Sequence, residues 1–239
     1  MTATWLLVAW TGLAAGVTHV LAGVDHLAAL LPMSVGRRFR AFFLGASWGL
    51  GHSAGVVLVG CLGLALRSSL DVEAVGSVAE RLVGVMLIGL GALGLRRALG
   101  LRLHSHVHEH DGTRHAHIHA HAAGGSIPAA HEADRALHRH RHAAFFAGTL
   151  HGVAGTAHLL GVLPALALPG FGASATYLAS FAVGTVAAMG AFAACLGAAT
   201  STASGASLRR TLIGASGLTV LVGLCWVALP ALGFDLPGH

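Results

Sequence analysis

The sequence predicts an all-α integral membrane protein whose six transmembrane helices form two inverted three-helix repeats. The first observation is composition: 55% of the 239 residues are hydrophobic and only 10% are charged, whereas soluble domains have about 25% charged residues. The second is a series of apolar segments near the roughly 20 residues that cross a bilayer. The third is a histidine motif that occurs once in each half of the chain.

Six apolar spans follow one another along the chain. They cover residues 4–32, 41–66, 78–99, 143–168, 174–199 and 208–232. The first is long enough to tilt or break, with Gly23 as a break point and Pro32 near its end. Since this run is too long for a signal peptide and no basic region precedes it, we interpret it as a retained helix.

The repeated motif reads His-x3-Gly-x2-His-Leu-x4-Pro, at residues 19–32 and again at residues 151–164. The second copy has Ala157 where the first has Asp25. Because three helices start at each copy, the second set enters the membrane from the opposite face, an arrangement typical of secondary transporters. The predicted domains are a first repeat, a histidine-rich linker and a second repeat, at residues 1–100, 101–142 and 143–239.

The basic residues predict the orientation in the membrane. All 14 are arginines, and twelve lie in connections on one side of the predicted helices. Positive charge gathers on the cytoplasmic flank, so we expect a protein of the cell inner (plasma) membrane with both termini outside and the linker in the cytoplasm. Without lysine there is no Walker A loop. We expect no nucleic-acid partner, and composition leaves homo-oligomer formation open.

The linker at residues 101–142 is rich in histidine and poor in apolar residues. We therefore expect it to be disordered. Flexible histidine tracts bind Ni, Cu, Co or Zn with little selectivity, which predicts metal capture, although a merely solvated polar loop is the alternative. The alternating histidines are His104, His106, His108, His110, His115, His117, His119 and His121.

A candidate metal path begins at His19, Asp25 and His26. Asp25 is the sole acidic residue well inside the long apolar segments, since Glu80 lies at the edge of the third; an unpaired charge there costs several kcal/mol. On one helix the two histidines lie about 10 Å apart along the axis, too far for one ion with bonds of about 2.1 Å. Either the helix unwinds at Gly23, or the histidines serve separate layers.

The second motif supplies the remaining candidates. Antiparallel packing of the first and fourth helices would pair His26 with His151 and His19 with His158, in two layers, with His52 between them. An unbroken first helix therefore predicts two metal stations, and a broken one merges them. A single histidine in an apolar helix is more often a hydrogen-bonded core residue, but two repeated pairs beside a carboxylate favour a functional path.

Small residues near these histidines have two interpretations. Ser53 and Thr156 are candidates for supporting metal ligands through hydrogen bonds, although such residues more often bond helix to helix. Three Gly-x3-Gly motifs, which begin at Gly12, Gly45 and Gly51, predict close helix packing.

At Gly23-Val-Asp25-His26-Leu-Ala-Ala, with His19 upstream and Trp48-Gly-Leu-Gly-His52 downstream, the chain resembles the nickel/cobalt transporter superfamily. It looks closest to the branch of urease-accessory-like transmembrane proteins. The resemblance covers nearly all of the membrane part and implies metal recognition by the residues of this motif.

By the same resemblance, His151 and His158 match the histidines of the second half. Two departures are visible. His19 and Asp25 are separated by five residues instead of the four of high-affinity importers, and Val24 stands where this branch often has proline. The histidine-rich loop is similar to that of efflux members, so the direction of transport stays open.

We therefore predict a secondary transporter of divalent transition-metal ions, not an enzyme, with Ni²⁺ or Co²⁺ first, Zn²⁺ as a further candidate and no permanently bound cofactor. Imidazoles suit these metals, and their deprotonation on binding makes proton coupling plausible. One alternative is an intramembrane zinc hydrolase, although no His-Glu-x-x-His motif is present. Another is a metal buffer or sensor that moves no ions. The expected path comprises His19, Asp25, His26, His52, His151 and His158.

Overall fold

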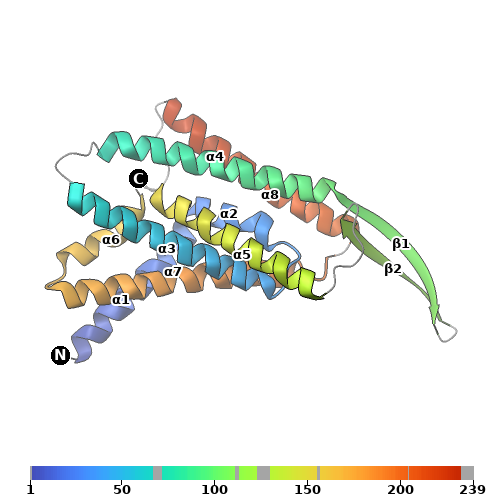
Figure 1. Ribbon diagram of the computed structural model, residues 1–239, viewed down its shortest axis with the longest axis horizontal. Coiled ribbons are helices and arrows are strands. Elements are labelled where there is room, and N and C mark those ends of the chain that lie inside the picture. The colour runs from blue at the N-terminus through green and yellow to red at the C-terminus, as the bar shows by residue number, and fades with distance from the viewer. Residues whose placement is uncertain are drawn as a thin grey trace.

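The computed structural model describes residues 2–66, 72–110, 113–122, 130–154, 157–203 and 205–232. Helices dominate this part of the chain, and a hairpin of two strands extends from the helical bundle (Figure 1). The elements are α1 (Thr2–Ala22), α2 (Val24–Ser34), α3 (Arg40–Leu66), α4 (Val72–Leu99), β1 (Leu101–His110), β2 (Thr113–Ala122), α5 (Ala130–Val153), α6 (Ala157–Ala167), α7 (Phe171–Ala199) and α8 (Gly205–Ala231).

Five segments of the described helices are long and apolar enough to cross a membrane. They are Thr4–Ala22, Arg40–Val59, Glu80–Leu99, Phe171–Ala199 and Gly205–Pro230. Large apolar side chains cover their outward surfaces; Trp10, for example, is 67% exposed and Phe171 is 90% exposed. Because so much exposed apolar surface is unfavourable in water, it indicates that the protein associates with a membrane.

Two of the predicted spans are broken helices. The first is split at Gly23, whose backbone is extended (φ −78°, ψ 101°) between α1 and α2. The prediction of one helix over residues 143–168 is corrected, because α5 ends at Val153 and α6 begins at Ala157. Glycine disfavours a helix by about 1 kcal/mol relative to alanine, and the repeat motif places Gly155, outside the described residues, at this second break.

The helices pack so closely at glycines that their backbones nearly touch. A Cβ atom on Gly51 of α3 would collide with the carbonyl oxygen of Phe145 in α5, and one on Gly152 of α5 would collide with that of His52. Gly16 meets the backbone of α7 in the same way. The predicted Gly-x3-Gly motifs are therefore confirmed as sites of close helix contact.

The order of these contacts gives the helix directions. Gly12 lies against Tyr177 and Gly16 against Phe181, so α1 and α7 run parallel; the contacts of α3 with α5 also run in parallel. By contrast, α3 is antiparallel to α7, and α4 is antiparallel to α8. It follows that α1 and α5 run in opposite directions. The main buried core lies among these helices, around Val20, Leu30, Trp48, Leu87 and Met189.

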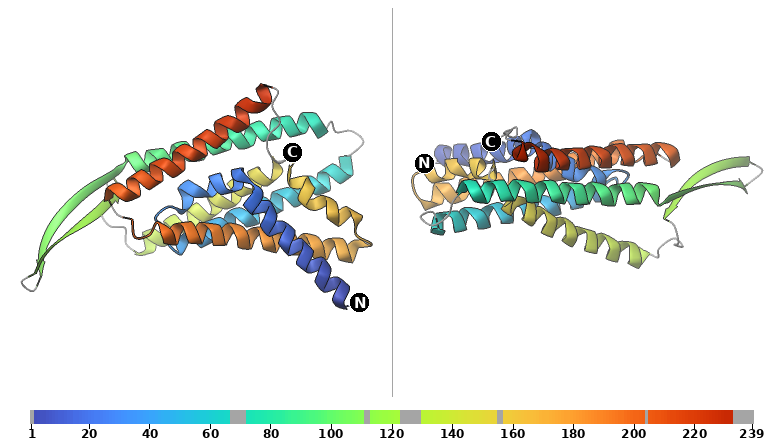
Figure 2. Two further views of the ribbon diagram at one scale, coloured as in Figure 1. Left: turned by 180° about the vertical axis from the view of Figure 1, so that it is seen from behind. Right: turned by 90° about the horizontal axis from the view of Figure 1, so that it is seen from above.

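Arginines of one connection and of neighbouring helix ends meet at one end of the bundle. The Gly36 N–H donates to Thr200 Oγ1 at 2.9 Å, and the Arg97 guanidinium reaches the carbonyl of Val35 at 3.5 Å. The α2–α3 and α7–α8 connections therefore lie beside the end of α4. The hairpin extends from this same end (Figure 2).

The histidine-rich linker differs from the expected disordered segment. Residues 101–142 hold both strands and the first half of α5. The antiparallel register sets His104 opposite His119, and it also pairs His106 with His117 and His108 with His115. Alternation of histidine with other residues has the period of a β-strand, a local signal that composition alone does not carry.

Candidate metal centre

The break at Gly23 brings the two histidines of the first motif, His19 and His26, close together. On a continuous helix His19 and His26 would lie about 10 Å apart along the axis. Here α2 changes direction after Gly23, and the two imidazole rings pack edge to face with centroids 4.6 Å apart. The predicted pair of separate layers is thus replaced by one cluster, because that prediction assumed an unbroken helix.

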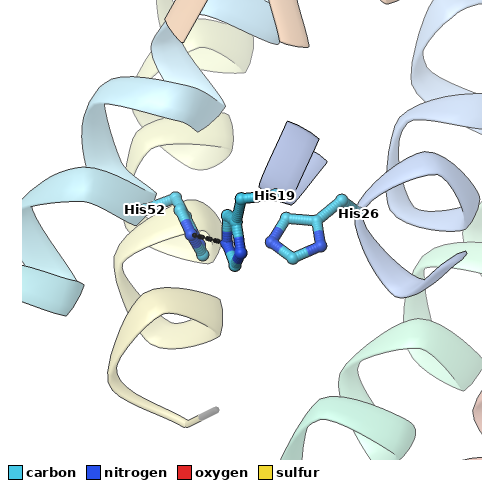
Figure 3. Close-up of side chains that lie close together, drawn as sticks. All are labelled: His19, His26 and His52. Atoms are coloured by element: carbon cyan, nitrogen blue, oxygen red, sulfur yellow. Dashed lines mark hydrogen bonds between the residues drawn. The ribbon is translucent and has the colours of Figure 1, made fainter. Parts of the chain in front are cut away.

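Two further imidazoles come from α3 and α5. His52 and His151 are both 0% exposed, and their ring centroids are 5.4 Å apart. The Nε2 atoms of His19 and His52 lie 3.3 Å apart. The His26 ring lies 4.8 Å from that of His52, so the rings of His19, His26 and His52 form a triangle (Figure 3). The glycine contacts that hold α3 against α5 set this geometry, since Gly152 follows His151 and touches the backbone of His52.

Asp25 joins the two halves of the chain. Its Oδ1 accepts a hydrogen bond from His26 Nδ1 at 3.0 Å, and its Oδ2 accepts one from His151 Nε2 at 3.0 Å. The His26 and His151 rings are themselves 4.7 Å apart, the proximity expected from antiparallel packing. The side chain of Asp25 is only 13% exposed, so these two contacts offset much of the cost of burying a carboxylate.

The cluster contains two overlapping sets of ligand atoms. His19, His26 and His52 form one set, and Asp25, His26 and His151 form the other; within each set the ligand atoms lie within 4.8 Å of one another. Ligands at about 2.1 Å from a tetrahedral ion would lie roughly 3.4 Å apart. Small side-chain rotations therefore suffice for either set to bind one divalent ion, and imidazole and carboxylate together suit Ni, Co and Zn.

Five of the six predicted ligands are thus brought together, from α1, α2, α3 and α5. The side chain of His158 and the whole of Thr156 lie outside the described residues, as do the side chains of the hairpin histidines. Ser53 is buried next to His52 in the chain, but its hydroxyl makes no hydrogen bond within the described part. The structure therefore does not connect Ser53 to the cluster.

Two aromatic residues beside the cluster were not predicted. Trp48 is 0% exposed, with its ring centroid 5.9 Å from that of His151, and Phe181 of α7 lies 5.5 Å from the His19 ring. Trp48 is one helical turn before His52, a spacing that places both on one face. Phe181 had no comparable signal, because its proximity depends on the packing of α1 against α7.

Comparison with known proteins finds two similar chains in Arabidopsis thaliana. Chloroplast protein FOR GROWTH AND FERTILITY 1 is 37% identical over 236 residues, which cover 97% of this chain and 62% of that protein. Chloroplast protein FOR GROWTH AND FERTILITY 2 is 35% identical over 232 residues, which cover 95% of this chain and 58% of that protein. This chain therefore spans about 60% of the length of these relatives.

No protein-family model matches the chain, and no solved structure matches it. The names of the two relatives place those proteins in the chloroplast and state no chemistry. The expectation of a cell inner membrane finds no support in them.

Proposed function

We propose that this protein is a secondary transporter of divalent transition-metal ions, with Ni²⁺ or Co²⁺ as the preferred cargo. One observation carries the proposal: four imidazoles and one carboxylate from four helices converge in the interior of an apolar helical bundle. Ionisable residues at such positions mark ion paths. The cluster binds its cargo through neutral imidazoles and an ionised carboxylate, so binding is coupled to proton release wherever these groups are protonated.

The arrangement of the helices supports transport over mere storage. We infer six spans in two inverted repeats, with the broken pair α5 and α6 counted as the fourth span. The opposite directions of α1 and α5 and the break in each half support this inference. Discontinuous helices at the interface of inverted repeats form the substrate sites of many secondary transporters, and the cluster lies beside such a break at Gly23.

The hairpin supports a second, peripheral role in metal capture. Its register sets three histidine pairs opposite each other across the strands, which offers repeated imidazole sites for divalent ions. We propose that the arginine-rich end, from which the hairpin extends, faces the cytoplasmic side of the membrane, because arginine accumulates on that flank.

A zinc hydrolase is the second candidate, because His19, His26 and His52 are the ligand set of a three-histidine catalytic zinc site. Such an enzyme needs an open position for water and access for a substrate. His26 and His52 are 2% and 0% exposed, and Asp25 is held by two histidines. This degree of enclosure favours an ion over a larger substrate.

Reconstitution into sealed liposomes tests the proposal. Uptake of Ni²⁺, Co²⁺ and Zn²⁺ is measured with and without a pH gradient, for the wild type and for His151→Gln. The matched control is His142→Gln, which changes an exposed histidine of the same helix. Saturable uptake that His151→Gln abolishes and His142→Gln preserves supports transport; tight binding without uptake would identify a buffer or sensor, and hydrolysis without uptake an enzyme.

A further inference from the structure

A cavity separate from the histidine cluster opens at the arginine-rich end of the bundle. It has a volume of about 340 Å³ and lies between α2, α3, α4 and α5. Its apolar walls include Met33, Leu44, Trp48 and Leu90, and two arginines, Arg37 and Arg97, line it. Two cationic groups in a mostly apolar cavity call for a balancing charge, because a buried charge without a partner is costly.

The described residues supply no such balance. The Arg97 guanidinium reaches only the carbonyls of Pro32 and Val35, both at 3.5 Å, and the buried Nε of Arg37 has no hydrogen-bond partner in the described part. Burial, followed by repulsion from Arg97, lowers the pKa of Arg37 to about 10. The two cations therefore oppose each other in a partly dehydrated site.

The carboxylates with described side chains lie far from the arginine pair. They are Asp25 and Glu80. Asp25 is near the start of α2 and Arg37 lies beyond its end, so about 14 Å of helix separates them, and Glu80 is about 25 Å from Arg97 along α4. Hence neither can neutralise the arginine pair.

The charge also rules out the simplest alternative, that the cavity is an entrance for the metal. Two positive groups repel a dication and attract an anion. The apolar walls favour an anion with an apolar part, because a small inorganic anion gains nothing from contact with apolar side chains. Leu93 also lines the cavity and is 62% exposed on the outward surface, so the cavity is continuous with the face that contacts lipid.

We propose that this cavity binds an anionic phospholipid, with its phosphate on Arg37 and Arg97 and an acyl chain leaving past Leu93 into the bilayer. Guanidinium groups bind phosphate through paired, charge-assisted hydrogen bonds. Basic pockets between transmembrane helices on the cytoplasmic side bind anionic headgroups in the same way. The bound lipid bridges the end of α2 to α4, and it contacts Trp48, which packs against His151.

The test compares lipids of one chain length in detergent solution. Thermal unfolding is measured with added phosphatidylglycerol, phosphatidylcholine or inorganic phosphate, and retained lipid is identified by native mass spectrometry. We expect phosphatidylglycerol alone to raise the melting temperature and to remain bound. Equal effects of phosphatidylcholine would overturn the proposal, and equal effects of inorganic phosphate would show a free-anion site instead of a lipid site.

Substitutions in the cavity test whether phosphatidylglycerol binds there. Arg97→Gln should weaken phosphatidylglycerol binding at least tenfold, whereas Arg96→Gln, the same change at the exposed neighbouring arginine, should leave it unchanged. Equal losses in the two variants would indicate general charge attraction and refute the site. If Arg97→Gln fails to fold, Ala143→Phe serves in its place. It fills the cavity from an exposed position on α5 and keeps both arginines, and unaltered lipid binding by this variant would refute the site.

Discussion

Replacement of Asp25 by asparagine is the sharpest test of the candidate metal centre. The substitution keeps the size of the side chain and removes its charge. In the wild type the carboxylate accepts two hydrogen bonds, from His26 and His151, each at 3.0 Å. Asparagine retains one acceptor oxygen and presents an NH₂ group to the other ring, so one contact is lost and the remaining one is no longer charge-assisted.

The expected magnitude follows from these contacts. A hydrogen bond to a charged group contributes about 1.5–3 kcal/mol, and about 1.4 kcal/mol corresponds to a tenfold change in affinity. Asp25→Asn should therefore weaken metal binding roughly 10- to 100-fold, the range also seen when groups that orient metal ligands are removed. If the carboxylate binds the ion directly, the loss of charge adds to this effect.

Isothermal titration of Ni²⁺ and Co²⁺ into purified protein measures the affinity, and liposome uptake at low metal concentration measures the consequence for flux. Glu80→Gln is the matched control, because it neutralises the other described carboxylate, on α4, which belongs to neither ligand set. A folded Asp25→Asn protein whose affinity stays within twofold of wild type would remove Asp25 from the site and refute the reasoning.

Three further predictions concern the elements that build the cluster. Gly23→Ala should reduce metal affinity with little change in helix content by circular dichroism, because the new Cβ collides with the His26 ring while the extended backbone at this position accepts alanine. Gly152→Leu should force α3 from α5 and destabilise the protein by at least about 1–3 kcal/mol in denaturant unfolding, whereas Gly214→Leu, which meets open space, should not. Replacement of every histidine in residues 104–121 by serine should abolish the low-selectivity metal binding that we propose for the hairpin, as measured by titration, and should preserve liposome uptake. Complete loss of uptake in correctly inserted protein would instead place the hairpin in the transport path.

The membrane character and the candidate ligand residues could be predicted from the sequence alone. Apolar composition determines how a segment partitions into lipid, regardless of its neighbours. A carboxylate and histidines in such segments are so costly that their presence favours a functional role, which made Asp25, His26 and His151 candidates before any geometry was known. Gly-x3-Gly spacing likewise reports a close helix contact locally, and the structure confirms this at Gly16 and Gly51.

Tertiary structure decided how those residues meet. Whether the first span breaks at Gly23 depends on partners that the broken form gains across the bundle, chiefly the contact of Asp25 with His151 in the other half of the chain. Periodicity within one segment carries no information about such a partner, so the two predicted layers became one cluster. The positions of Phe181 and of the Arg37–Arg97 pair have the same origin, because each depends on which helices pack together and not on the local pattern of any one of them.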